Sequence, residues 1–137
     1  LMFHFVKNHP KYYEFIRKLR NDERVQGGFI DQLPHITKEQ QKKYMDKYKD
    51  NFYICLGFGG DGIKPKPVGY IRHIDGDIGV CTNPTYQGRG IATFMIKELI
   101  KRHPNCYAKI KLNNEASIKA FEKAGFKKEY YILKLQK

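Results

Sequence analysis

The clearest pattern of apolar and polar positions lies between residues 90 and 102 and repeats at the period of a helix. Charged side chains take the opposite face, and the basic ones fall in the last turn, where the helix dipole favours positive charge. Pro104 follows and ends the pattern. We therefore expect an amphipathic helix whose apolar stripe packs on a core: Ala92, Met95, Ile96, Leu99 and Ile100.

Three further helices are predicted from signals at their ends. Pro10 favours a helix start near the N-terminus. Thr37 and Gln40 form a capping box, which predicts a second, lysine-rich helix to about Lys49. Gly125 is a typical stop signal and predicts the end of a last helix that starts near residue 114.

Shorter apolar runs predict strands at residues 2–7, 52–58, 67–74, 77–82, 106–112 and 126–135. Asp75-Gly76 is a strong hairpin signal, so the strands beside it should be antiparallel, and the glycines of 59–62 predict a turn. A helix joins 77–82 to 106–112, so these two should be parallel. The order βααβββαβαβ predicts a layered α+β fold with a mixed, largely antiparallel sheet of about six strands and helices on both faces.

Length and cysteine content indicate the number of domains and the cellular location. The 137 residues suffice for a single domain over 1–137. Three widely spaced cysteines in apolar runs favour reduced, buried thiols and a cytoplasmic location, and none has metal-ligand spacing, so no metal is expected. No signal-peptide layout and no apolar run of about 20 residues is present, so no membrane association is expected.

The net charge is +12, from 26 basic and 14 acidic residues. Such a surface attracts polyanions, which include nucleic acids and a coenzyme with several phosphates. A solvated lysine face without a partner gives the same composition. The sequence has no RNA-binding aromatic signature and no zinc-finger spacing, which disfavours nucleic acid.

The loop before the central helix has the features of an anion site. Gly88 and Gly90 let a ligand approach the main chain, the first N–H groups of the helix lack internal partners, and Arg89 adds a charge. A tight turn is the alternative explanation for the two glycines. Position 93 is Thr, which excludes a dinucleotide fingerprint, and a P-loop would need Gly-Lys-Ser/Thr.

The chain reads QGRGIA at residues 87–92 and NEASIKAFEKAGF at residues 114–126. These two motifs together resemble the GNAT family of N-acetyltransferases. Residues 87–92 read Q-x-x-G-x-A after a strand and into a helix, which is similar to that family's acetyl-CoA motif. Residues 114–126 are similar to its second signature, with six positions in register: Asn114, Ser117, Phe121, Lys123, Gly125 and Phe126. Residues 19–22 and 36–39 resemble the subgroup that acetylates ribosomal-protein N-termini and nucleotide-linked amino sugars.

The resemblance implies a coenzyme site. Main-chain groups near Val80 and Cys81 would hold the pantetheine arm and the thioester carbonyl, at a point where strands 77–82 and 106–112 splay apart. From the last helix, Asn114, Ser117 and Phe121 would contact the coenzyme, although a plain N-cap is the alternative for Asn114. The pyrophosphate would bind at Gln87, Gly88, Arg89, Gly90, Ile91, Ala92 and Thr93.

The implied reaction is direct attack of a neutral amine on the thioester. Asp77 is the best candidate for the base, with His73 and Glu98 as weaker ones. A turn position is the alternative for Asp77 because it follows Asp75-Gly76. A covalent acetyl-Cys81 route is also conceivable but disfavoured, since Cys81 has no visible base partner.

Two departures from the family pattern affect this reading. Phe121 stands where many relatives have a Tyr that protonates the leaving thiolate, so solvent, Tyr86 or Tyr130 would have to replace it. Only a short tail follows Phe126, which leaves one side of the acceptor pocket open or completed by another subunit of a homodimer.

The expected function is acetyl-CoA-dependent acetylation of a primary amine, on a small molecule such as an amino sugar or on a protein N-terminus. The +12 charge favours a neutral or anionic acceptor, with a nucleotide-linked amino sugar ahead of a protein N-terminus. A basic module that binds nucleic acid or another polyanion, and a coenzyme A-binding sensor without strong catalysis, are the alternatives.

Overall fold

The computed structural model describes residues 2–31, 35–58 and 64–137. Three short 3₁₀ turns, η1 (Pro10–Tyr12), η2 (Lys49–Asn51) and η3 (Pro84–Tyr86), supplement the longer elements. The turn expected at 59–62 lies outside the described residues. In chain order the elements are β1 (Met2–Lys7), α1 (Tyr13–Arg20), α2 (Glu23–Gln26), α3 (Lys38–Tyr48), β2 (Phe52–Phe58), β3 (Lys66–Ile74), β4 (Asp77–Thr82), α4 (Ile91–Arg102) and α5 (Glu115–Lys123).

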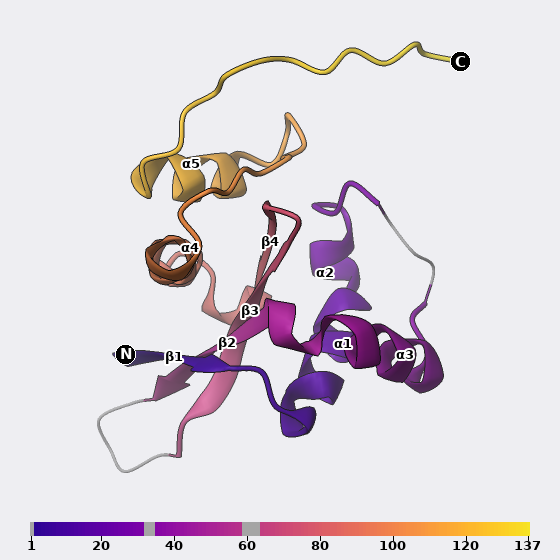
Figure 1. The fold of residues 1–137 in the computed structure, drawn as a ribbon, viewed down its shortest axis with the longest axis vertical. Coiled ribbons are helices and arrows are strands. Elements are labelled where there is room, and N and C mark those ends of the chain that lie inside the picture. Colours follow the sequence, from indigo (N-terminus) through magenta and orange to yellow (C-terminus); the bar gives the residue numbers. More distant parts are fainter. Residues whose placement is uncertain (1, 32–34, 59–63) are drawn as a thin grey trace.

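The strands form one antiparallel sheet in the order β1-β2-β3-β4 (Figure 1). The hairpin between β3 and β4 is confirmed: Asp75 and Gly76 both have positive φ, 51° and 84°, as a tight two-residue turn requires. The capping box is confirmed too, because the Gln40 N–H donates to Thr37 Oγ1 and the Thr37 N–H donates to Gln40 Oε1. Local signals therefore placed these elements correctly.

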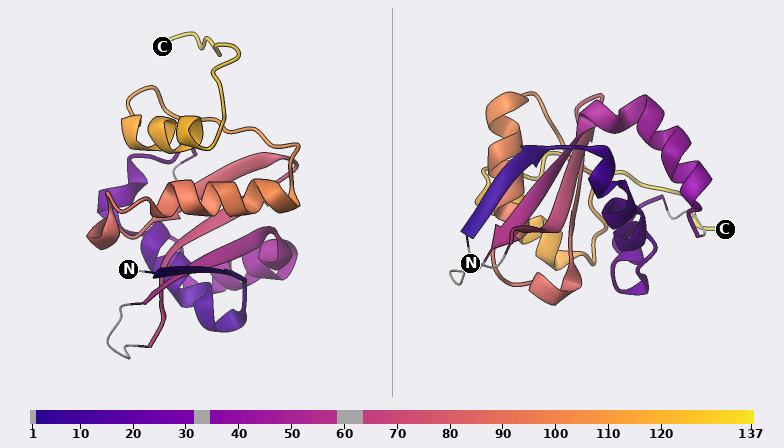
Figure 2. Two further views of the ribbon diagram at one scale, coloured as in Figure 1. Left: turned by 90° about the vertical axis from the view of Figure 1, so that its left-hand side faces the viewer. Right: turned by 90° about the horizontal axis from the view of Figure 1, so that it is seen from below.

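Helices cover both faces of the sheet, as expected (Figure 2). α1 and α3 pack on one face, and α4 and α5 on the other. Neighbouring strand residues divide between the two cores, because successive side chains of a strand point to opposite faces. On β2, Ile54 joins the core under α1 and α3, whereas Cys55 joins the core under α4.

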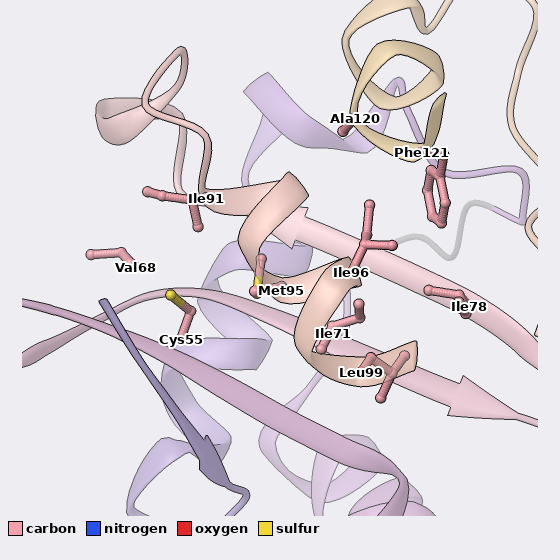
Figure 3. Packing of buried hydrophobic residues seen from close by; sticks show 10 residues of the cluster. All are labelled: Cys55, Val68, Ile71, Ile78, Ile91, Met95, Ile96, Leu99, Ala120 and Phe121. Atoms are coloured by element: carbon pink, nitrogen blue, oxygen red, sulfur yellow. The ribbon is translucent and has the colours of Figure 1, made fainter. Parts of the chain in front are cut away.

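α4 buries the middle of the stripe that its periodicity predicted (Figure 3), whereas Ala92 and Ile100, at its two ends, are half-buried. Met95, Ile96 and Leu99 are fully buried and Ile91 is nearly so. The helix comes close to the sheet because Gly69 on β3 has no side chain. A Cβ there would lie 2.8 Å from the Met95 Cε and 2.9 Å from the Cys81 carbonyl oxygen.

The expected sheet of about six strands is wrong in number, since the described residues form four strands. At 106–112 a single parallel bridge joins Asp77 to Tyr107. The Ile78 N–H donates to the Tyr107 carbonyl oxygen at 2.9 Å, and the Tyr107 N–H donates to the Gly76 carbonyl oxygen at 2.8 Å. The parallel direction is therefore confirmed at one point. No further backbone pair between 79–82 and 108–112 occurs in the described chain, so a ladder does not form.

The strand expected at 126–135 is also absent from the structure. Residues 127–137 form an extended, exposed tail beyond α5 (Figure 1). A strand needs a neighbouring strand to satisfy its N–H and C=O groups. Segment 106–112 makes only one bridge, to Asp77, and in the described chain no strand pairs with the tail. Apolar alternation alone could not supply that partner.

Replacing Gly69 by Ala should destabilise the protein by about 1–3 kcal/mol, because the added methyl meets both α4 and the β4 backbone. Urea unfolding of the two proteins measures the difference. Gly27→Ala is the matched control, since Gly27 has φ of −62° and nothing lies within 4 Å of its Cβ position. Equal loss of stability in both variants would contradict close packing at Gly69.

Candidate active site

The loop from β4 to α4 presents open main chain at a helix start. Gly88 and Gly90 have φ of 79° and 77°, a backbone conformation that residues with a side chain rarely adopt. Nothing lies within 4 Å of the position that a Cβ would take at either glycine. Gly90 is the N-cap of α4 and offers no side-chain hydrogen bond, and the first turn has no acidic residue. The N–H groups of the first turn lack intrahelical acceptors and can bind an anion.

Basic side chains strengthen the positive potential of this loop. Two cations lie over the ring of Tyr86: the Lys66 Nζ is 5.2 Å and the Arg89 Cζ is 5.5 Å from its centroid. Residues 87–90 are exposed, so a ligand can reach them. Lys66, from the start of β3, is a contributor that the sequence motif did not indicate.

The outer edge of β4 has free backbone groups next to this loop. β4 pairs with β3 on one side, but on the other side its pairing ends after the Asp77–Tyr107 bridge. Within the described residues, the edge from Gly79 to Thr82 has no strand partner. The main chain of Val80 and Cys81 lies on this edge, so its expected contact with the coenzyme stays a prediction that the free edge allows.

The side chain of Cys81 points away from this edge into the core formed with α1 and α3. It is 6% exposed, and burial raises the pKa of its thiol to about 12. A thiol with that pKa is protonated near neutral pH, and the thiolate is the nucleophile. The structure thus disfavours the covalent route through Cys81.

Asp77 begins β4, directly after the two turn residues. Its Oδ2 lies 4.0 Å from the Lys109 Nζ, and its side chain is 23% exposed. Along a strand that rises about 3.3 Å per residue, Asp77 is roughly 10 Å from Val80. An amine near Val80 would therefore exchange its proton with Asp77 through water rather than directly.

Arg72 is a residue near the site that sequence reasoning missed. It pairs with Gly79 across the β3–β4 ladder, and its guanidinium lies over Gly79, 2.9 Å from where a Cβ would be. It is half-buried, and in the described part of the chain no carboxylate lies within salt-bridge distance of it. Only the strand register reveals this position, because the arginine stands in an ordinary alternating pattern.

Asn114 is the N-cap of α5, which was the alternative to a role in coenzyme binding. Its Oδ1 accepts a hydrogen bond from the Ser117 N–H at 3.3 Å. Its amide also lies against the loop after α2, with Nδ2 3.0 Å from the Cβ position of Gly28. Nearby, the Lys111 Nζ donates to the Gly27 carbonyl at 2.9 Å. The glycine pair allows this loop to approach the start of α5.

Phe121 does not line an open site, which corrects our expectation. Its ring is 4% exposed and packs between α5 and α4, with its centroid 5.1 Å from that of Phe126 (Figure 3). Helical spacing places Phe121 on the buried face of α5, so a coenzyme could reach its ring only by opening the core. Ser117, one turn earlier, is half-buried.

The other candidates for proton transfer lie elsewhere. His73 and His103 stack with ring centroids 3.8 Å apart beside a cavity of about 260 Å³, at the end of α4 opposite the loop 87–90. Burial, and then the neighbouring His103, lower the pKa of His73. Glu98 pairs with Lys101 and Arg102 on the surface of α4. Tyr130 is 75% exposed in the tail.

A comparison of the sequence with protein families shows which family the chain belongs to. The model of the acetyltransferase (GNAT) family matches residues 12–126, most of the chain. The chain belongs to the acetyltransferase (GNAT) family. The resemblance read from residues 87–92 and 114–126 is thereby confirmed, and with it the prediction of a coenzyme A-dependent N-acetyltransferase. The subgroup is not confirmed. Among curated protein sequences, none matches the acetyltransferase significantly.

Solved structures share the acetyltransferase fold at low identity. A domain from Methanocaldococcus jannaschii is 20% identical with a TM-score of 0.82, over 93% of this chain and 90% of that one. Spermidine N-acetyltransferase from Vibrio cholerae, with CoA and spermine, is 14% identical with a TM-score of 0.78, over 95% and 83%. An aminoglycoside acetyltransferase bound to coenzyme A is 16% identical with a TM-score of 0.67, over 93% and 86%.

Among the described residues, no helix of the acetyltransferase is both long and apolar enough to span a membrane. In the same residues, no three His, Cys, Asp or Glu side chains gather as a metal ion would need.

Proposed function

We propose that this acetyltransferase moves the acetyl group of acetyl-CoA to the primary amine of a small anionic molecule, by direct attack of the amine. The observation that carries the proposal is the junction of β4 and α4. There, a strand edge without a partner among the described residues leads through the loop 83–90 to a helix start with open glycines. An extended arm that ends in a pyrophosphate needs both features, in that order.

The residues present fit the coenzyme. A pyrophosphate would accept hydrogen bonds from the first-turn N–H groups of α4, between the charges of Arg89 and Lys66. The free backbone of Val80 and Cys81 would hold the pantetheine arm as a neighbouring strand does. Acetyl-CoA supplies an activated thioester, and the protein has to position it and control the charges around it.

The chain supplies two groups for the reaction itself. Backbone N–H groups at the splayed edge would stabilise the negative charge that develops on the carbonyl oxygen. Asp77 would take the amine proton through an ordered water, with Lys109 holding its carboxylate in place. Phe121 cannot protonate the departing thiolate, so solvent is the proton source we favour.

We propose the chemical class of the acceptor from the positive charge near the site and of the whole chain. Arg72 offers a guanidinium without a carboxylate partner among the described residues, close to the edge where the amine must arrive. Together with the net charge of +12 it favours an acceptor with a carboxylate or phosphate. A nucleotide-linked amino sugar fits this chemistry better than a protein N-terminus. The V. cholerae relative was solved with spermine, a polycation that this surface should repel.

Gly90→Asp should weaken coenzyme A binding by roughly tenfold or more, because it places a negative charge at the positive end of α4. Gly90→Asn is the matched control, since Asn has the same shape, tolerates positive φ and carries no charge. Titration calorimetry with coenzyme A measures both. If the two variants bind alike, charge at this loop does not determine affinity.

Asp77→Asn should lower kcat by roughly 100-fold and leave coenzyme affinity nearly unchanged, because the side chain would act on the amine proton. Asp75→Asn removes a neighbouring carboxylate whose backbone position Asn can adopt, and should retain full activity. Thiol release from acetyl-CoA gives the rate. Full activity of Asp77→Asn would remove Asp77 from the mechanism.

An amine panel tests the function as a whole. We expect coenzyme A thiol release with UDP-linked amino sugars, with lower kcat/KM for peptide N-termini and the lowest for spermidine and kanamycin. Arg72→Gln should raise KM for the anionic amines and change KM little for an uncharged one. Preference for spermidine would overturn the proposed acceptor class. Coenzyme binding without thiol release for any amine would favour a sensor.

A further inference from the structure

The cavity at the C-terminal end of α4 has no part in the proposed acetyl transfer. It lies at the opposite end of this twelve-residue helix from the loop 87–90, roughly 18 Å away along the helix axis. Its volume of about 260 Å³ is below the usual size of sites for drug-sized ligands, so it suits a ligand of a few atoms. Its lining includes His73 and Gly76 on one side and Arg102, His103, Asn105 and Cys106 on the other.

Stacked rings hold the two histidines of the cavity in place. On the face of the sheet that α4 covers, Phe5 of β1 stacks on Tyr53 of β2 with ring centroids 4.9 Å apart. Tyr53 is 6.2 Å from His73 of β3, and His73 is 3.8 Å from His103. The Tyr53 hydroxyl oxygen also lies 3.4 Å from the His103 Nε2. Contacts from two strands therefore orient the His103 ring.

The charged side chain that lines the cavity is positive. The Arg102 Cζ lies 5.0 Å from the ring centroid of Phe5 and 5.7 Å from that of Tyr53. Its carboxylate partner is Glu98, one turn earlier in α4, with 3.6 Å between the Arg102 Nη1 and the Glu98 Oε2. Among the described residues that line the cavity there is no Asp or Glu. An anion that enters would therefore meet a guanidinium and two imidazoles.

The negative end of the α4 dipole would by itself oppose an anion at this place. Three carbonyl groups at this end of the helix are, however, already engaged. The His103 N–H donates to the Leu99 carbonyl at 2.9 Å, and the Arg102 Nη1 donates to the Glu98 carbonyl at 2.9 Å. The Cys106 thiol donates to the His103 carbonyl. These bonds reduce the negative charge that the helix end presents to the cavity.

His73 supports the site without contacting a ligand through Nε2. This nitrogen is closed off from solvent and has no hydrogen-bond partner among the described residues. Burial, and then the neighbouring His103, lower the pKa of His73, so its ring stays neutral near pH 7. Two imidazoles this close cannot both become charged without strong repulsion. The first proton taken up by the pair therefore belongs on the better solvated ring, and an anion would supply its counter-charge.

We propose that this cavity binds a small oxyanion, a phosphate or carboxylate group, held by the guanidinium of Arg102 and the ring of His103. Hydrogen bonds from charged donors to an oxyanion are stronger than those between neutral groups. The neutral ring of His73 stacks on the His103 imidazolium and holds it toward the anion. Because His103 gains its proton as the anion binds, affinity rises as the pH falls.

The groups that face the histidine pair come from several elements. They are the Tyr53 hydroxyl from β2, Arg102 and its partner Glu98 from α4, and the Cys106 thiol from the segment after α4. Burial raises the pKa of the Cys106 thiol, which keeps it neutral near pH 7. Among side chains, only an imidazole ordinarily changes its charge between about pH 5 and 8. A pH dependence of binding in this range therefore reports on the histidines.

Amide NMR spectra recorded while sulfate is added test the site directly. Sulfate is the first probe because its charge does not change in this pH range, and EDTA is present so that no metal ion mediates binding. We expect saturating shifts at the amides of residues 102, 103, 105 and 106, with a Kd of roughly 1–10 mM at about pH 6. At about pH 8 the Kd should be about fivefold higher or more.

The same spectra separate this cavity from the loop 87–90, whose own amides report any anion bound there. Acetate, titrated in the same way, shows whether a carboxylate binds as well as a tetrahedral oxyanion does. Absence of saturating shifts at residues 102–106 with both anions would overturn the proposal. A Kd that is equal at the two pH values would overturn it too. Neither result depends on acetyl transfer.

Arg102→Gln should raise the Kd for sulfate by about fivefold or more, because it removes a charged donor from the cavity. Lys101→Gln is the matched control, since Lys101 also pairs with Glu98, at 3.2 Å, but does not line the cavity. Its Kd should change by less than about twofold, because an exposed charge is screened by salt. Equal weakening in both variants would show a general effect of net charge and refute the site.

His103→Gln separates the proton from the shape of the site. Glutamine keeps a polar side chain but takes up no proton in this range, so sulfate should bind this variant with the same weak Kd at both pH values. Circular dichroism shows whether each variant keeps the fold, and the pH series on the wild type stands even where Arg102→Gln does not. A pH dependence that persists in His103→Gln would contradict the role of His103.

Discussion

The contact between α4 and the sheet is the constraint on which the rest of the site depends. Met95 packs on Gly69, close to the carbonyl of Cys81, so the helix and the end of β4 are held at a fixed spacing. The loop between them has to cross that spacing within eight residues, 83–90. Gly88 and Gly90 allow the crossing by adopting positive φ. The proposed anion site is therefore a consequence of core packing, and the donors that we propose for it are backbone groups rather than side chains.

A second feature is that backbone pairing beyond β4 ends after one bridge to segment 106–112. The bridge from Asp77 to Tyr107 fixes the direction of segment 106–112, and beyond it no backbone hydrogen bond joins this segment to β4 in the described residues. Unpaired strand edges tend to pair with other chains. Here one such edge, that of β4, faces the space proposed for the pantetheine arm. In the part of the chain that the structure describes, no strand pairs with the outer edge of 106–112 either.

Burial decides which polar side chains can take part in chemistry. Cys81 and Asp77 lie on the same strand, yet desolvation raises the pKa of the Cys81 thiol to about 12 while Asp77 stays partly exposed beside Lys109. His73 is held beside His103 at the far end of α4. Asp77 is therefore the base that we propose for the β4 edge, and the guanidinium of Arg72, on β3, lies over Gly79 of β4.

The sequence by itself determined the elements that local interactions specify. The α4 stripe, the capping box at Thr37, the Asp75-Gly76 turn and the Gly125 stop each depend on residues a few positions apart, and each is present in the structure. The two coenzyme motifs were also readable, because they are short and contiguous. Tertiary structure decided the remainder. Whether 106–112 and 126–135 become strands depends on a distant partner, the burial of Phe121 depends on how α5 packs on α4, and the place of Arg72 depends on strand register. None of these follows from neighbouring residues, because each is set by contacts between segments far apart in the chain.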